Sequence, residues 1–256
     1  MKNPPVPHRQ KYRAIIQYAG TRYAGWQIQK NALTVQGVLR ETLSRLAGYP
    51  VTVVGSGRTD SGVHALGQVA HFFFPEKESI PDLRRALNAL LPWDIRVIRL
   101  APAAPGFHAQ KQALKKRYEY RILTADVLPP FLHARVHHLP LRLDLDALQE
   151  GAALLRGRHD FSSFTAAASR VRSHTRTVLL SDFRRKGHRL VYRIEADGFL
   201  HHMVRNIVGT LIEVGLGKRR PQDLPALLEA RDRTLAGPTA PADGLYLVRV
   251  WYRPSS

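Results

Sequence analysis

Segments with the period of a β-strand alternate with segments with the period of a helix along the first 100 residues. Four strands are predicted there, at 11–18, 51–54, 65–74 and 95–100, and two helices, at 34–48 and 81–91. The resulting order, β-α-β-β-α-β, is the ferredoxin-like arrangement. A similar order follows residue 106, with strands predicted at 116–123, 176–185, 189–196 and 245–252 and helices at 145–155, 199–214 and 221–230. The sequence therefore predicts two α+β halves.

The segment Ala101–Gly106 (APAAPG) is a plausible linker between these halves. We predict an N-terminal half over residues 11–105 and a C-terminal half over residues 106–256. Residues 1–10 are polar and rich in proline, which is typical of a flexible basic tail.

The charge balance indicates a polyanionic partner. The chain has 39 Lys and Arg against 20 Asp and Glu, a formal net charge of +19, and 30 of the 39 cations are arginines. Guanidinium groups bind phosphates and stack on bases, so this surplus favours nucleic acid. A general bias of the genome toward arginine is the alternative. The absence of cysteine excludes disulfides, thiolate zinc sites and a cysteine nucleophile.

No apolar run approaches the roughly 20 residues of a membrane-spanning helix, and a cytoplasmic protein without a membrane partner is expected. The 12 histidines show neither HExxH nor a zinc-finger spacing, and no GxGxxG or GxxxxGK[ST] motif occurs. We therefore expect no metal and no nucleotide cofactor.

Asp60 lies in a polar, glycine-rich turn between two predicted strands, within GSGRTDSGVHALG (residues 55–67). Glycines on both sides let the backbone turn sharply and leave the carboxylate exposed, as a nucleophile requires. Arg58, two residues earlier, would point the same way in an extended loop and would favour the ionised carboxylate. From residue type alone, an Asx-turn aspartate and a solvated surface arginine remain open.

Arg205 lies inside a predicted apolar helix. The helix predicted at 199–214 is apolar nearly all round, so Arg205 within it needs a partner, and we expect that partner to be Asp60. The alternative is an arginine whose aliphatic part is buried while its guanidinium group reaches solvent.

Tyr118 and Tyr120 share one face of the strand KKRYEYRI and could form a base-stacking platform. A core position is the alternative, above all for Tyr120.

Five segments resemble, in the same order, the bacterial tRNA pseudouridine synthase A family, and together they span nearly the whole chain. They are YAGTRYAGWQIQ (18–29), GRTDSGVHALGQVAHF (57–72), HDFSSF (159–164), DGFLHHMVRNIVGT (197–210) and AGPTAPADGLYLVRV (236–250).

The resemblance implies a role for each of five residues. Asp60 corresponds to the catalytic aspartate, Arg58 to a residue that holds the target nucleotide, and Tyr118 to the tyrosine that stacks on the target base. Arg205 corresponds to the arginine that pairs with the aspartate, and Leu245 to an apolar residue that lines the pocket.

The resemblance also implies a fold, partners and a substrate. The expected fold is α+β, with two ferredoxin/RRM-like βαββαβ halves whose sheets join into one extended, mostly antiparallel sheet, and with a basic cleft between the halves. The family needs no cofactor and works as a homodimer in which both subunits touch one tRNA. Its substrates are the uridines at positions 38, 39 and 40 of the anticodon stem-loop.

Two rival functions fit parts of the sequence. A non-catalytic basic RNA-binding module or RNA chaperone suits the charge and the element order equally well, but it gains nothing from a carboxylate that faces phosphates. A metal-dependent nuclease or phosphotransferase needs clustered carboxylates, and the Asp60 motif contains no second acidic residue.

Overall fold

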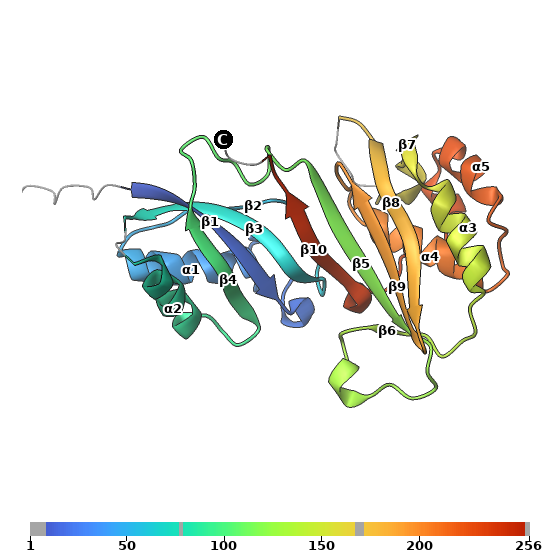
Figure 1. Ribbon diagram of the computed structural model, residues 1–256, viewed down its shortest axis with the longest axis horizontal. Coiled ribbons are helices and arrows are strands. Elements are labelled where there is room, and N and C mark those ends of the chain that lie inside the picture. The colour runs from blue at the N-terminus through green and yellow to red at the C-terminus, as the bar shows by residue number, and fades with distance from the viewer. Residues whose placement is uncertain (1–8, 77–78, 167–171, 254–256) are drawn as a thin grey trace, which may run out of the picture. The chain divides into compact units, whose positions relative to one another are not determined.

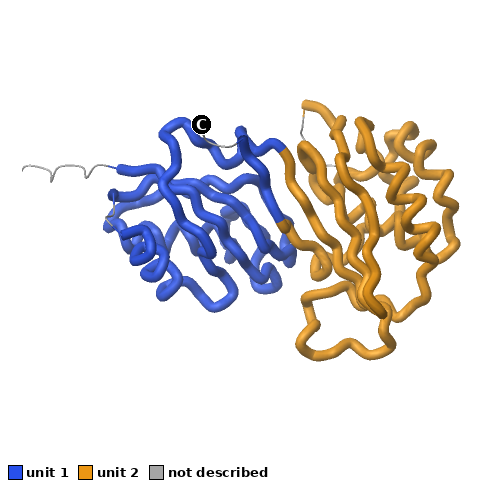
Figure 2. Tube along the Cα trace, in the orientation of Figure 1, with its two compact units in different colours: residues 1–114, 249–256 blue, residues 115–248 orange. Residues whose placement is uncertain are grey.

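The computed structural model describes residues 9–76, 79–166 and 172–253. These residues divide into two compact units, shown in blue and orange in Figure 2. Unit 1 comprises Met1–Leu114 and Arg249–Ser256, and unit 2 comprises Lys115–Val248. The tail predicted over residues 1–10 lies outside the described residues, except for Arg9 and Gln10, which belong to the first strand.

Unit 1 contains the four strands and two helices predicted for the first 100 residues, in the predicted order, and one short 3-10 helix, η1, that was not predicted (Figure 1). They are β1 (Arg9–Tyr18), η1 (Gly20–Arg22), α1 (Val35–Ala47), β2 (Val53–Gly55), β3 (His64–Pro75), α2 (Ile80–Leu90) and β4 (Ile95–Pro102). Strand β1 pairs with β3 and β4, and β2 pairs with β3, all antiparallel. The loop that carries Asp60 is therefore the connection between two neighbouring strands, β2 and β3.

Helix α1 shows how local signals set an element's bounds. Thr34 caps its start, since the Thr34 Oγ1 accepts a hydrogen bond from the Gly37 N–H at 3.3 Å. Gly48 ends it in the left-handed region, with φ +76°. The buried leucines Leu39 and Leu43 face the same core as alternate residues of β1, including Tyr12 and Ile16.

Unit 2 contains the remaining elements, except that the last three residues of β10 belong to unit 1. They are β5 (Lys115–Leu123), η2 (Pro130–Leu132), β6 (His137–His138), α3 (Leu145–Leu154), β7 (Gly157–Asp160), η3 (Ser162–Phe164), β8 (Thr175–Lys186), β9 (Arg189–Ala196), α4 (Met203–Gly215), α5 (Asp223–Ala230), η4 (Arg233–Leu235), η5 (Ala242–Gly244) and β10 (Leu245–Trp251). Strands β5, β9, β8 and β7 are neighbours in that order, all antiparallel, and β6 pairs parallel with β5. Helices and mostly antiparallel strands place the chain in the mixed α+β class.

The helix predicted at 199–214 is shorter than expected, because α4 begins at Met203. The carbonyl of His201 accepts hydrogen bonds from the Ala166 N–H at 3.0 Å and from the Thr165 hydroxyl, so it does not open the helix. His202 takes a left-handed conformation, φ +61°. The prediction that this helix is buried is confirmed, since nearly all residues of α4 are buried.

None of the helices within the described ranges is long and apolar enough to cross a membrane.

Candidate functional site

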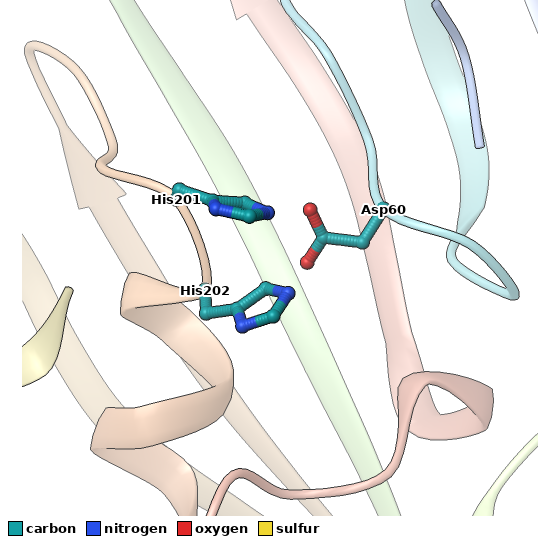
Figure 3. A group of neighbouring side chains, drawn as sticks. All are labelled: Asp60, His201 and His202. Carbon is teal, nitrogen blue, oxygen red and sulfur yellow. The ribbon is translucent and has the colours of Figure 1, made fainter. Parts of the chain in front are cut away.

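The Asp60 loop joins β2 to β3, and Figure 3 shows the Asp60 side chain projecting from it. The loop ends in a tight turn, in which the Val63 N–H donates to the Asp60 carbonyl at 3.2 Å and Gly62 has φ +80°. Asp60 is partly exposed and Arg58 is exposed. The sharp turn that the sequence predicts around Asp60 is therefore present in unit 1.

A second segment of unit 1, residues 20–26, holds this loop by backbone contact. A Cβ on Gly25, which has φ +90°, would lie 2.5 Å from the Thr59 carbonyl oxygen, and one on Gly20 would lie 1.9 Å from the Val63 carbonyl oxygen. The Trp26 N–H donates to the Thr59 carbonyl at 3.0 Å. Only glycine allows such approach, so two of the motif segments found in the sequence are parts of one structure.

Buried polar side chains fix the loop from its other side. The hydroxyls of Tyr18 and Thr59 hydrogen bond at 2.8 Å. Gln68 donates to the Gly57 carbonyl at 3.0 Å and accepts from the Ser56 hydroxyl at 2.6 Å. Burial raises the pKa of Tyr18 to about 12, so its hydroxyl stays neutral. The Thr59 hydroxyl and the Gly57 carbonyl of the loop thus have partners within unit 1 before any ligand arrives.

The holding segment is anchored by an aspartate that the sequence analysis did not single out. Asp94, 5% exposed, accepts a hydrogen bond from the Tyr23 hydroxyl at 2.6 Å and pairs with Arg22 at 3.3 Å. The Tyr23 carbonyl in turn accepts from the Gly62 N–H at 3.3 Å. No local sequence pattern connects residue 94 with residue 60, so this link could only be found in the structure.

In unit 2, Tyr118 lies on β5 with 7% of its surface exposed. Its ring meets that of Phe199 edge to face, with centroids 4.9 Å apart. Tyr120 shares the face, is fully buried and donates its hydroxyl to the Pro241 carbonyl at 2.8 Å. The alternative of a core position is therefore correct for Tyr120.

Arg205 lies on α4 and is partly buried. Its Nε donates to the Ala240 carbonyl at 2.7 Å, and the Ala240 N–H donates back to the Arg205 carbonyl at 3.1 Å. These two hydrogen bonds hold Arg205, through its Nε, against the segment 236–240. Pairing of Arg205 with Asp60 involves a residue from each unit and stays a prediction.

Asn206, next to Arg205, joins three motif segments of unit 2 and was missed by the sequence analysis. It is fully buried. Its amide nitrogen donates to the Phe164 carbonyl at 2.8 Å, and its oxygen accepts from the Thr239 hydroxyl at 2.7 Å and from Arg233 at 3.2 Å. The segments 159–164, 197–210 and 236–250 therefore meet at one side chain.

The residues just before α4 are held in an unusual conformation. The ring centroids of His201 and His202 lie 4.0 Å apart, and Figure 3 shows the two rings next to one another. A positive φ at His202 is strained for a residue with a Cβ, and such strain is common at functional sites. Leu245 opens β10 and is 5% exposed, and its role in lining the site stays a prediction.

Comparison with known proteins identifies the class. A family model described as tRNA pseudouridine synthase matches residues 14–110 and 152–253. The chain belongs to the tRNA pseudouridine synthases, isomerases that convert uridine in tRNA to pseudouridine.

Similar curated proteins carry a more specific name. The chain is 46% identical to tRNA pseudouridine synthase A of Geobacillus kaustophilus, over 95% of both chains. It is 45% identical to that of Oleidesulfovibrio alaskensis, over 94% of this chain and 96% of the relative. Among solved structures, an archaeal box H/ACA sRNP complex matches at 12% identity with a TM-score of 0.31, over 79% of this chain and 44% of that chain. A TM-score this low does not establish a shared fold.

Proposed function

We propose that this chain isomerises the uridines at positions 38, 39 and 40 of the tRNA anticodon stem-loop, with Asp60 as the nucleophile. The observation that carries the proposal is the construction of the Asp60 loop. Its backbone is held by glycine contacts from residues 20–26 and by buried hydrogen bonds, and Asp60 itself is partly exposed. A rigid loop that presents one acid group suits a nucleophile better than a binding surface.

The chemistry needs only one carboxylate. The N1–C1′ bond of the target uridine breaks, the base turns, and a C1′–C5 bond forms. C5 then loses its proton while N1 gains one, so mass and redox state are conserved. Attack of Asp60 at C1′, attack at C6 and initial removal of a sugar proton all use the same group.

The other site residues would assist this step. The target base leaves its stack at a cost of a few kcal/mol, roughly, which stacking on Tyr118 offsets by about 1–3 kcal/mol. Arg205 pairs with the Asp60 carboxylate, Arg58 holds the nucleotide, and Leu245 lines the pocket.

In the proposed mechanism the two halves of the chain have complementary roles. The N-terminal half (11–105) supplies Asp60, and the C-terminal half (106–256) supplies Tyr118 and Arg205. The proposal includes one continuous sheet across the halves, a basic cleft between them, a homodimer on one tRNA and a cytoplasmic location. The supporting facts are the net charge of +19 and the names of the relatives.

The direct test uses unmodified tRNA transcripts. We expect pseudouridine at positions 38, 39 and 40 after incubation with the purified chain, mapped base by base, and the same yield in EDTA. Binding without product would favour the RNA-binding module, and strand cleavage that EDTA abolishes would favour the nuclease. Pseudouridine at other positions alone would contradict the proposed substrate.

Arg205→Lys should lower turnover roughly 10- to 100-fold, because a point charge replaces a planar fork that makes charge-assisted hydrogen bonds of about 1.5–3 kcal/mol. Arg219→Lys is the matched control, since Arg219 also pairs with a carboxylate, Glu213 of α4, at 3.2 Å. Single-turnover rates on saturating tRNA separate the two variants, with thermal melts as the check on folding. If Arg205→Lys and Arg219→Lys turn over at the same rate, Arg205 has only a structural role.

A further inference from the structure

Lys116 occupies the same face of β5 as Tyr118, two residues along the strand. In the sheet of unit 2 it lies opposite Ala196, the last residue of β9, while Tyr118 lies opposite Ile194. Ala196 also pairs with Val178 of β8. Lys116 therefore lies at the end of the sheet from which the segment 197–202 leads to α4.

A second cation, Arg176, lies at this corner. A Cβ on Gly198 would be 3.1 Å from the Arg176 Nε, so the absence of a side chain at position 198 makes room for the guanidinium. Arg176 Nη1 donates to the carbonyls of Ser173 and Thr175, at 3.0 and 2.6 Å. These two bonds orient the guanidinium and use one of its three nitrogens.

The neighbouring carboxylates of unit 2 have other partners. Asp197, which follows β9, accepts a hydrogen bond from the Thr177 N–H at 3.0 Å. Glu195 is on the opposite face of the sheet, where it pairs with Lys115 at 2.7 Å and with Arg117. Within the described residues of unit 2, neither of these carboxylates forms an ion pair with Lys116 or Arg176.

The electrostatics of Lys116 are unfavourable. Burial, and then the positive charge of Arg176, lower the pKa of Lys116 to about 8. A lysine held in this way destabilises the folded protein at neutral pH, and an arriving anion would relieve the cost. Such an arrangement is expected where a ligand supplies the missing charge.

We propose that Lys116 and Arg176 bind a phosphodiester group of the RNA strand whose base stacks on Tyr118. Residues two apart on a strand are separated by roughly 7 Å, a separation on the scale of one nucleotide from base to phosphate. The inference rests on the proposed function, since it takes the RNA and the stacked base from it. It adds a phosphate subsite formed by β5 and β8.

The first test compares Lys116→Gln with Lys115→Gln in the full-length protein. Both variants lose one charge from the same strand, but Lys115 faces the other side of the sheet and pairs with Glu195. The probe is an unmodified anticodon stem-loop RNA, measured by equilibrium binding at several salt concentrations. Lys116→Gln should bind about tenfold more weakly, and its salt slope should be shallower by about 0.7–0.9, the value for one phosphate contact.

The second test uses pH. Arg176 of β8 is the charged side chain that acts on Lys116, while the partner position on β9 is the uncharged Ala196. RNA affinity of the parent protein should fall as pH rises from 7 to 9, because Lys116 loses its proton. Lys116→Arg should retain its affinity over that range, since arginine stays charged.

The third test is stability without RNA. The folded-state pKa of Lys116 is below its unfolded value of about 10.4, so the charged form costs stability below pH 8, and this cost fades as pH rises toward 10. Lys116→Met should therefore raise the melting temperature at pH 7 while it weakens RNA binding. A lysine with only a structural role would show the opposite change in melting temperature.

The proposal is overturned if Lys116→Gln matches Lys115→Gln in affinity and salt slope, or if Lys116→Met lowers the melting temperature. These outcomes are separate from failure of the proposed function, because they are equilibrium measurements that need no turnover. The function itself fails only if the intact protein forms no pseudouridine at the expected positions.

Discussion

Asp60→Asn should reduce pseudouridine formation by roughly 10⁴-fold or more, the order of loss seen when a nucleophile is removed, while tRNA affinity changes less than about twofold. The amide has nearly the same shape and fits the same turn, but it lacks the negative charge that attacks carbon. The measurement is tritium release from tRNA labelled at C5 of uridine, alongside equilibrium binding of the same tRNA.

Asp82→Asn provides the matched control, because Asp82 belongs to the same unit and is exposed on α2, where it pairs with Arg85. Its turnover should equal that of the parent protein. Tritium release by Asp60→Asn at the parental rate would remove Asp60 from the mechanism.

Gly25→Ala should lower turnover roughly 100-fold, with little change in tRNA affinity. The added Cβ would lie 2.5 Å from the Thr59 carbonyl and 3.1 Å from the Asp60 carbonyl carbon, so the loop backbone must shift. Displacement of a reacting group by about 1 Å is enough for a loss of this size. Single-turnover rates measure the effect, and a pseudouridine assay at saturating tRNA separates it from binding.

Gly48→Ala isolates the steric contact from backbone strain. Gly48 also has a positive φ, +76°, but nothing lies within 4 Å of the position of its Cβ. It should cost about 1 kcal/mol of stability and leave turnover unchanged. If Gly25→Ala and Gly48→Ala turn over alike, the contact between residue 25 and the Asp60 loop does not position the carboxylate.

Elements with strong local signals could be predicted from the sequence. Helix α1 has a capping threonine, a periodic apolar face and a terminal glycine within 15 residues, and its predicted bounds are correct to within one residue. Strands β6 and β7 were not predicted, because two and four residues are too few to show a period. The start of α4 was misplaced because Ala166 and Thr165, more than 30 residues away, bind the His201 carbonyl.

The same distinction applies to the candidate site. The turn around Asp60 and the shared face of Tyr118 and Tyr120 depend on neighbours in sequence, and both were predicted. Asn206 and Gly25 were missed, since their importance comes from contacts with segments far along the chain. Helix burial drew attention to Arg205, but its bond to the Ala240 carbonyl could not be read from periodicity.

The final strand has a consequence for how the protein must be made. Strand β10 begins in unit 2 and ends in unit 1, where the Trp251 carbonyl accepts from the Leu114 N–H at 2.9 Å and the Tyr252 hydroxyl donates to the Ala109 carbonyl at 2.7 Å. Unit 1 is therefore completed by residues that follow unit 2 in the chain. Unit 1 can therefore finish folding only after the whole of unit 2 has been translated, and a fragment that stops before residue 249 lacks the part of β10 that belongs to unit 1.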